Sequence, residues 1–321
     1  MAKARGADEL LNSLSGLRGT PLTDAGREFI AKGLASRVNF AAAKAAELVR
    51  EFKLAGHCAD LQDAFGRFLK AGDKGCAALT AAARAALELE CPAEELFRAG
   101  IRHVQMEGSF GPPVDVAAEL RGLSALGLVM VRAKGFMNHL ADLLADPEPT
   151  ARIGAIRALA YSGREDGALL LRFKASGGDE DPAVIGECLT ALLQLQPRDA
   201  LPLVERFLDS DEESLCEEAA LALGSSKAAG AFELLKARYF PHADPQFRRV
   251  LLTAMATQRS AAASEFLTSL VGTEPAPLAA EVLKTMRIYR NDSAVRQALS
   301  QIVQTRNDPS LSAVFQREFE S

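Results

Sequence analysis

The sequence has few of the residues on which several functional classes depend. Its 321 residues include no Trp and three Tyr, so platforms for stacking nucleic-acid bases are scarce. The 37 basic and 42 acidic side chains give a net charge of −5, which also argues against a dedicated nucleic-acid binder. With 48% hydrophobic and 25% charged residues, the composition is that of an ordinary globular protein, which excludes disordered and collagen-like classes.

Cysteines and long apolar runs are also scarce. The five cysteines are an odd number with no Cys-x-x-Cys spacing: Cys58, Cys76, Cys91, Cys188 and Cys216. This pattern predicts reduced thiols in a cytoplasmic protein rather than a disulfide framework. The longest apolar run, residues 122–131, ends at Arg132, so neither a secretion signal nor a membrane span is expected.

Motifs for metal, nucleotide or acyl-transfer chemistry are absent from the sequence. The four histidines are far apart: His57, His103, His139 and His242. Only His57 adjoins a cysteine, and neighbouring residues on a helix point about 100° apart, so that pair is a poor chelate. Phosphate-binding glycine loops and Gly-x-Ser-x-Gly do not occur. We therefore predict no catalytic residue, no metal and no cofactor.

A repeat of about 32 residues dominates the C-terminal half. Amphipathic helical segments end in two small or apolar residues: Ala158-Leu159, Ala191-Leu192, Ala222-Leu223, Ala254-Met255 and Thr285-Met286. The second members of these pairs are 33, 31, 32 and 31 residues apart, and a second amphipathic segment follows each first one. A fixed spacing of this length is typical of stacked helical repeats.

The same register continues towards the N-terminus through Leu126, Leu87 and Leu48, with longer connections. Asp residues open several units, as in Asp146-Pro147 and Asp244-Pro245, where an Asp caps the next helix. Alternating strand patterns are missing, so the expected fold is all-α, with about eight helix pairs stacked in a solenoid. We assign residues 37–306 to the repeats, 1–36 to N-terminal capping helices and 307–321 to a C-terminal cap.

The stretches DPEPTARIGAIRALAYSGREDGALLLRF, DPAVIGECLTALLQLQPRDALPLVERFL and DEESLCEEAALALGSSKAAGAFELL carry a family resemblance. They resemble HEAT repeats, in particular the short variety first described in phycobilisome-lyase-type proteins. The resemblance implies a right-handed α-α superhelix that binds partners on a concave face made by the second helices. A basic residue expected in each first helix is present at Arg152 and Arg248 but not in the two repeats between them, so a regular Asp–Arg ladder is not expected.

The least repeat-like segment is IRHVQMEGSFGPPVDVA, residues 101–117. Its glycines and prolines interrupt the helix pairs, and insertions in a solenoid fall on one rim. The segment is either a binding loop with Phe110 as apolar anchor or a longer connector. The predicted partner contacts are in this loop or in and beside the second helices: Arg102, His103, Gln105, Glu107, Phe110, Asp115, His139, Arg172 and Arg206.

Charge is unevenly distributed along the chain. Residues 176–222 carry twelve acidic and two basic side chains, a local net charge of −10, whereas residues 223–306 carry a net charge of +5. Two acidic clusters lie at the same phase of successive repeats, so stacking predicts one acidic edge: Asp179, Glu180, Asp181, Asp209, Asp211, Glu212 and Glu213. This edge is either a solubilising helix-start pattern or a docking site for a basic protein segment.

These observations predict a non-enzymatic scaffold that binds a protein or peptide through the concave face or the acidic edge. The alternative is an enzyme or enzyme subunit of the bilin-lyase type, which would hold a ligand in an enclosed apolar cavity. A third reading, nucleic-acid binding as in HEAT-like DNA glycosylases, lacks the aromatic side chains for stacking. The sequence does not determine the oligomeric state.

Overall fold

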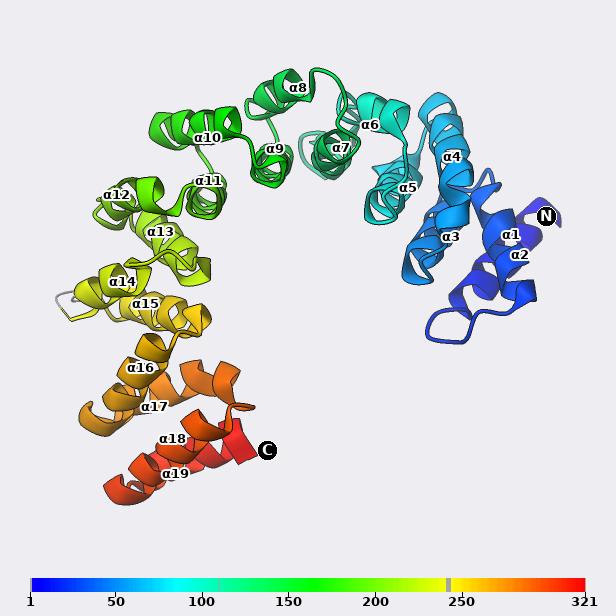
Figure 1. Cartoon of the computed structure of the whole chain (residues 1–321). Coiled ribbons are helices and arrows are strands. Elements are labelled where there is room, and N and C mark those ends of the chain that lie inside the picture. Colours follow the sequence, from blue (N-terminus) through cyan, green and yellow to red (C-terminus); the bar gives the residue numbers. More distant parts are fainter. Residues whose placement is uncertain (1, 109, 241–243, 321) are drawn as a thin grey trace. The chain divides into compact units, whose positions relative to one another are not determined.

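Helices form nearly all of the regular structure. The computed structural model describes residues 2–108, 110–240 and 244–320. Within these residues the only sheet is a pair of two-residue strands, β1 (Met106–Glu107) and β2 (Val114–Asp115). The predicted fold class, an all-α solenoid of helix pairs, is confirmed (Figure 1). Contacts divide the chain into two units, Met1–Leu170 (unit 1) and Leu171–Ser321 (unit 2), and the predicted caps at 1–36 and 307–321 stay predictions.

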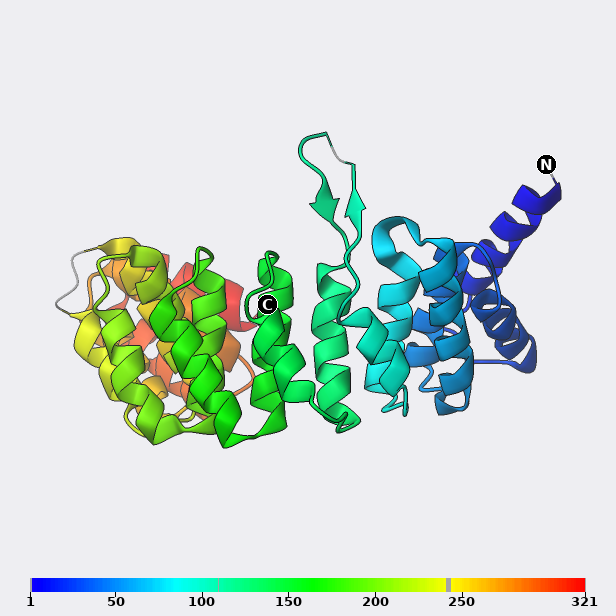
Figure 2. The same cartoon turned by 90° about the horizontal axis from the view of Figure 1, so that it is seen from above.

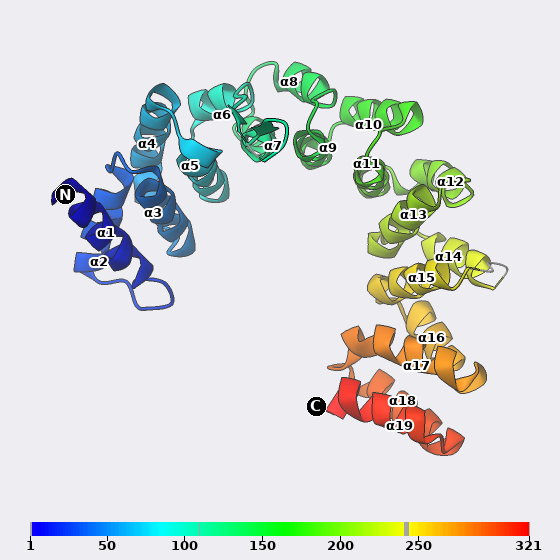
Figure 3. The same cartoon turned by 180° about the vertical axis from the view of Figure 1, so that it is seen from behind.

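Unit 1 consists of two layers of helices (Figure 3). The inner layer contains α1 (Ala2–Ser15), α3 (Asn39–Glu51), α5 (Ala77–Glu88), α7 (Ala118–Met130) and α9 (Pro149–Ser162). The outer layer contains α2 (Asp24–Leu34), α4 (Cys58–Ala71), α6 (Glu94–Gly100) and α8 (Phe136–Leu143). The short helices η1 (Ala55–His57) and η2 (Lys74–Cys76) lead into α4 and α5, and α10 (Glu165–Gly177) spans the boundary between the units.

Unit 2 repeats the two-layer arrangement. Its inner layer contains α11 (Pro182–Leu195), α13 (Glu213–Ser225), α15 (Pro245–Gln258) and α17 (Ala276–Thr285). Its outer layer contains α12 (Pro197–Leu208), α14 (Ala231–Tyr239) and α16 (Ala261–Thr273). The unit ends with η3 (Met286–Tyr289), α18 (Ser293–Arg306), α19 (Pro309–Phe315) and a π-helical turn, η4 (Gln316–Glu320).

Small residues bring the inner helices close together in each unit. A side chain at Gly154 on α9 would overlap the backbone of Gly122 on α7, and one at Gly224 on α13 would overlap the backbone of Ala254 on α15. Each outer helix contacts the inner helix that follows it more than the one that precedes it, and neighbouring outer helices of unit 1 contact one another little. Each unit therefore curves with its inner layer on the concave side (Figure 1). The expectation that the second helices make the concave face is wrong, because α8, α12 and α14 form the convex layer.

Helix capping follows the predicted pattern only in part. Asp181 accepts a hydrogen bond from the backbone N–H of Ala183, and Asp244 accepts one from Phe247. Glu148 takes the capping position of α9, and the Asp146 carboxylate instead binds a guanidinium of α7. Asp146 therefore forms an ion pair with Arg121 instead of a helix cap.

A disulfide joins Cys58 and Cys91, whose Cα atoms are 5.6 Å apart. The two cysteines are separated by 33 residues, one repeat length, so stacking places the start of α4 beside the segment that follows α5. The prediction of five reduced thiols is therefore wrong for this pair, and Cys76, Cys188 and Cys216 are free and buried. In the described part of the chain, none of the helices is both long and apolar enough to cross a bilayer.

Candidate functional site

The segment predicted as a loop forms a β-hairpin that stands out from one edge of unit 1 (Figure 2). Met106 pairs with Asp115 and Glu107 with Val114 in an antiparallel ladder. Sequence reasoning missed these strands because two residues are too few to show an alternating pattern. The hairpin extends beyond the ends of α6 and α7 and does not fold over the inner layer of unit 1.

A buried ion network fixes one side of the hairpin base. Arg121 on α7 is only 2% exposed, and its Nη1 donates to Asp115 Oδ2 at 2.7 Å. Its Nε and Nη2 donate to the two oxygens of Asp146, both at 2.8 Å, and Nη1 also donates to the carbonyl oxygen of His103 at 3.0 Å. A planar guanidinium suits this arrangement because its donors are fixed in a fork. The network therefore ties both ends of the inserted segment to the next repeat.

The pKa of the Asp115 carboxyl reflects this network. Burial by itself would raise that pKa, but the backbone N–H groups of Ala117 and Gln105 and the Arg121 guanidinium lower it below its usual range. The two backbone hydrogen bonds measure 2.9 and 3.1 Å. Asp115 is thus held as a carboxylate inside the base of the hairpin.

The other side of the hairpin base binds the preceding repeat. Gln105 Nε2 donates to the carbonyl oxygen of Asp73 and to Glu107 Oε1, both at 2.6 Å. The backbone N–H of Gly75 also donates to Glu107 Oε1 at 2.6 Å, and these two donors lower the pKa of Glu107. Asp73 is itself buried and accepts from the Leu79 N–H and from the side chain of Asn39. The hairpin is therefore anchored on both flanks.

Apolar side chains cover the projecting part of the hairpin. Met106 and Val114 on the strands are 57% and 51% exposed, Val104 at the base is 61% exposed, and Phe110 is fully exposed. Residues 108–113 contain no charged side chain. A rigid stem that presents uncharged apolar groups to solvent has the character of a protein contact surface.

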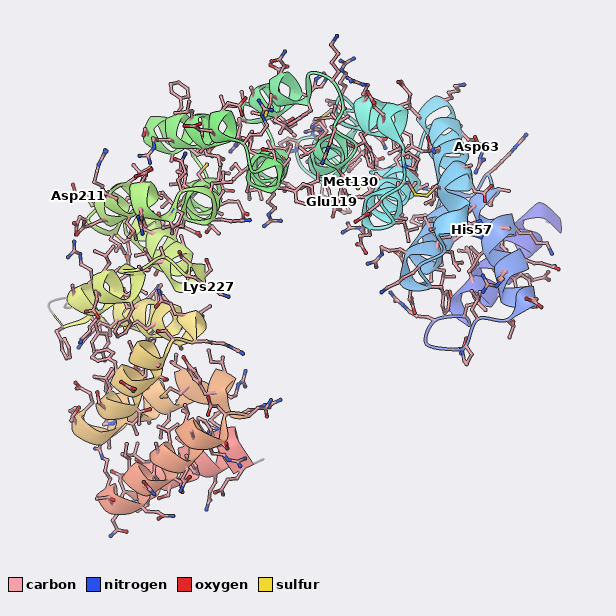
Figure 4. All side chains as sticks on the ribbon, in the orientation of Figure 1. His57, Asp63, Glu119, Met130, Asp211 and Lys227 are labelled. Carbon is pink, nitrogen blue, oxygen red and sulfur yellow. A yellow bond between two sulfur atoms is a disulfide. The ribbon has the colours of Figure 1, made fainter. Side chains whose placement is uncertain are left out.

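A groove of about 700 Å³ runs over the inner layer of unit 1, and the hairpin base borders it through Val116. Its lining includes an exposed aromatic ring, Phe40, and four cations, Arg18, Lys44, Arg50 and Arg84. Each cation lies within ion-pairing distance of one carboxylate: Arg18 with Glu51, Lys44 with Glu47, Arg50 with Glu88 and Arg84 with Glu119. Three of these pairs, those of Arg18, Arg50 and Arg84, join successive repeats. Figure 4 labels Glu119, the partner of Arg84. The groove is open, close to neutral and unlike an enclosed apolar cavity.

Comparison with known proteins identifies the repeats. A family model described as HEAT repeats matches residues 137–224. The predicted resemblance is confirmed for this segment, and no curated protein matches the sequence.

Among solved structures, the complex of CpcE and CpcF of phycocyanin lyase from Nostoc sp. PCC7120 is similar at 16% identity, with a TM-score of 0.39. That match covers 92% of this chain and 96% of the other. An engineered protein is similar at 15% identity and a TM-score of 0.33, covering 97% and 98% of the two chains. At these TM-scores the likeness does not extend to function.

Two of the predicted contacts, Arg102 and His139, lie just after α6 and on α8 in the outer layer, away from the groove. His139 is on α8, and its Nε2 lies 3.4 Å from Arg98 Nη1. Burial, then the charges of Arg102 and Arg98, lower the pKa of His139. His103 connects to the hairpin network instead, with Nε2 3.1 Å from Gln105 Oε1. The structure thus gathers His103, Gln105, Glu107 and Asp115 at the hairpin base and leaves Arg102 and His139 beside it.

The remaining predicted residues belong to unit 2 and do not join this site. Arg172 donates to the carbonyl oxygen of Asp199 at 2.9 Å, and Arg206 lies on the outer helix α12. In the predicted acidic edge, which lies within the HEAT repeats, Asp179 pairs with Lys174 at 2.7 Å and Asp209 with Arg238 at 2.6 Å. The exposed members are Glu180, Asp209, Asp211, Glu212 and Glu213, and Figure 4 labels Asp211. Part of the edge therefore serves helix capping and pairing within the unit.

Metal and nucleic-acid chemistry gain no support from the side-chain arrangement. The described residues contain no group of three His, Cys, Asp or Glu side chains that could hold a metal ion, and His242 lies outside them. Tyr239 and Tyr289 are buried, and the Tyr289 hydroxyl donates to the carbonyl oxygen of Ala256. Neither ring is available to stack on a base.

Sequence reasoning missed Arg121, which organises the site. Its signal is present in the sequence, because Arg121 precedes Arg152 by 31 residues, one repeat length. Arg152 occupies the equivalent helix position, and its Nη1 donates to the carbonyl oxygens of Asp146 and Pro147. Extending the basic position of the repeat back by one unit identifies the residue that holds the hairpin.

Proposed function

We propose that this chain is a non-enzymatic scaffold that binds a protein or peptide through the hairpin and the adjoining groove of unit 1. The observation that carries the proposal is the uncharged tip of the projecting hairpin, with its exposed Phe110, above a base fixed by buried ionic hydrogen bonds. Burying charges costs several kcal/mol per ion unless they are paired with good geometry. A connector does not need such a base, whereas a contact surface benefits because a fixed hairpin loses little entropy on binding.

Phe110 is the expected anchor of the contact. Burying a phenylalanine side chain contributes about 1.5–3 kcal/mol, so its removal should weaken binding by roughly ten- to a hundred-fold. Phe40 in the groove offers a second apolar contact next to the charged pairs. A segment that spans both would be held at two points by one rigid unit.

The test compares Phe110→Ala with Phe173→Ala, a matched removal of another exposed phenylalanine. Partners captured from native lysate are identified by mass spectrometry, and a photo-crosslinking residue at position 110 then reports direct contact. Phe110→Ala should lose a partner that the wild type and Phe173→Ala both retain, with unchanged helical circular dichroism. Equal retention by both variants would refute the hairpin as the binding element, and a loss of helicity would make it structural.

The groove bears on the alternative of a ligand-holding enzyme subunit. Such a subunit needs an enclosed apolar cavity, and charged pairs line this open groove. An open groove lined by charged pairs therefore favours a macromolecular partner. The cytoplasmic location expected from the sequence stays a prediction.

A further inference from the structure

The Cys58–Cys91 disulfide joins a partly exposed cysteine to a fully buried one. Cys58 is the first residue of α4 and is partly exposed, whereas Cys91, after α5, is fully buried. Figure 4 shows the bond between α4 and α5 and labels the preceding residue, His57. The pair is independent of the hairpin and groove contacts on which the proposed function rests.

We infer that Cys58 and Cys91 form a thiol–disulfide exchange site, at which a small thiol of the glutathione class attacks the Cys58 sulfur. Exchange begins at the sulfur that the attacking thiolate can reach. Cys91 is buried, so it serves as the leaving sulfur. The site confines the redox chemistry of the chain to one pair.

The other three cysteines are shielded from the same chemistry. Burial raises the pKa of the Cys76 thiol to about 11 and that of Cys188 to about 12. Burial also raises the pKa of Cys216, whose sulfur contacts the carbonyl oxygen of Ser210 at 3.0 Å. Because the thiolate is the reactive form, these side chains stay inert near neutral pH.

The surroundings of Cys58 favour a reactive thiolate once the bond opens. Cys58 begins a 14-residue helix, and its N-cap, His57, makes no side-chain capping hydrogen bond. The positive end of a helix dipole stabilises a thiolate at this position. Asp60 in the same turn opposes this effect, but its carboxylate lies 2.7 Å from His57 Nδ1.

The exchange proceeds in two balanced steps. The thiolate of the small thiol bonds to the Cys58 sulfur, the Cys58–Cys91 bond breaks, and Cys91 leaves as a thiolate that takes a proton from water. A second small thiol then attacks the sulfur of the first small thiol in the mixed disulfide. This releases Cys58 as a thiolate and forms the disulfide of the two small thiols. The two small thiols supply both electrons that reduce the protein.

Opening the pair removes a link between α4 and the segment after α5. A disulfide that closes a loop of this length stabilises by constraining the unfolded chain. For a unit of this size, reduction should lower the Tm by roughly 10 °C. Thermal unfolding of the full chain with and without a reducing thiol measures this shift.

The decisive experiment uses the full chain and the variants Cys58→Ser and Cys91→Ser with oxidised glutathione under native conditions. Intact-mass measurement should find one glutathione on Cys91→Ser, mapped to Cys58, and none on Cys58→Ser. Oxidised wild type should present three alkylatable thiols after unfolding. Five thiols in that sample, or equal modification of both variants, would overturn the inference. In wild type alone, peptide mapping after limited reduction should find Cys58 modified first, and prior labelling of a buried cysteine would also overturn it.

Discussion

Replacing Arg121 by methionine leaves the carboxylates of Asp115 and Asp146 without the guanidinium that they share. Methionine keeps much of the side-chain volume, so the loss is mainly electrostatic. Removing one partner of a buried ion network costs about 3–5 kcal/mol, because the remaining charges stay buried. For a unit of about 170 residues this corresponds to a fall in Tm of roughly 10 °C, measured by circular dichroism.

Arg84→Met is the matched control, because the Arg84–Glu119 pair is 37% and 53% exposed. Exposed pairs contribute about 0–1 kcal/mol, so this variant should unfold within a few degrees of the wild type. If the Arg121→Met variant is as stable as the Arg84→Met variant, the Arg121 guanidinium does not stabilise the fold through its buried ion pairs, and the reasoning is refuted.

The pH dependence gives a second check on Arg121. The folded-state pKa of Asp115 is lowered, so its stabilising contribution is present above the unfolded value of about 3.9 and is lost as the pH falls through the folded pKa. In Arg121→Met the buried carboxylates lack this support and take up protons at higher pH. The difference in unfolding free energy between wild type and variant should therefore shrink between pH 7 and pH 4. A constant difference would contradict the electrostatic explanation.

Two further predictions concern packing and the acidic edge. Gly154→Ala should destabilise the chain by about 1–3 kcal/mol, because its side chain would overlap Gly122, whereas Gly66→Ala, in an open helical position, should stabilise it by about 0.5–1 kcal/mol. Denaturant unfolding of both variants measures the contrast, and equal effects would disprove the close inner-layer contact. Reversing the exposed charges Asp211 and Glu212 to lysine at the start of α13 should cost at most about 2 kcal/mol through the helix dipole and abolish capture of any basic partner docked on the acidic edge. Unchanged capture would leave this edge with a solubilising role.

Residues one repeat length apart account for much of what the sequence predicts. The helix pairs follow from the regular spacing, and the same spacing relates Gly122 to Gly154 and Cys58 to Cys91. Those pairs lie side by side in the structure, yet neither was predicted, because the repeat was followed for apolar, acidic and basic positions and not for glycine or cysteine. The order of helices within a pair does not determine which layer packs more tightly, so the concave face was assigned to the wrong helices.

The hairpin and its anchors are harder to predict from sequence. Its strands pair over two residues, and the turn residues at Gly111 and Pro112 are compatible with an ordinary connector. The contacts of Gln105 and Glu107 reach back about 32 residues to main-chain atoms, which carry no sequence signal. Only Asp115 and Arg121 had a pattern that repeat alignment could identify.

The ion network shows how an inserted hairpin fits into a repeat without disrupting it. Arg121 bonds the Asp115 side chain six residues before it, just as Arg152 bonds the carbonyl oxygen of Asp146 six residues before it. The hairpin is therefore anchored at Asp115, a position that the repeat already fixes. Its tip, residues 108–113, lies beyond that anchor.

Replacing residues 108–113 by Asn-Gly tests this separation of anchor and tip. The two-residue turn suits the pairing of Glu107 with Val114, because a type I′ turn matches the twist of adjacent strands. Since every ionic contact of the base remains, the Tm should stay within a few degrees of the wild type, while partner binding through Phe110 is lost. A fall in Tm as large as that of Arg121→Met would mean that the tip stabilises unit 1, and the main support for its role in binding would be removed.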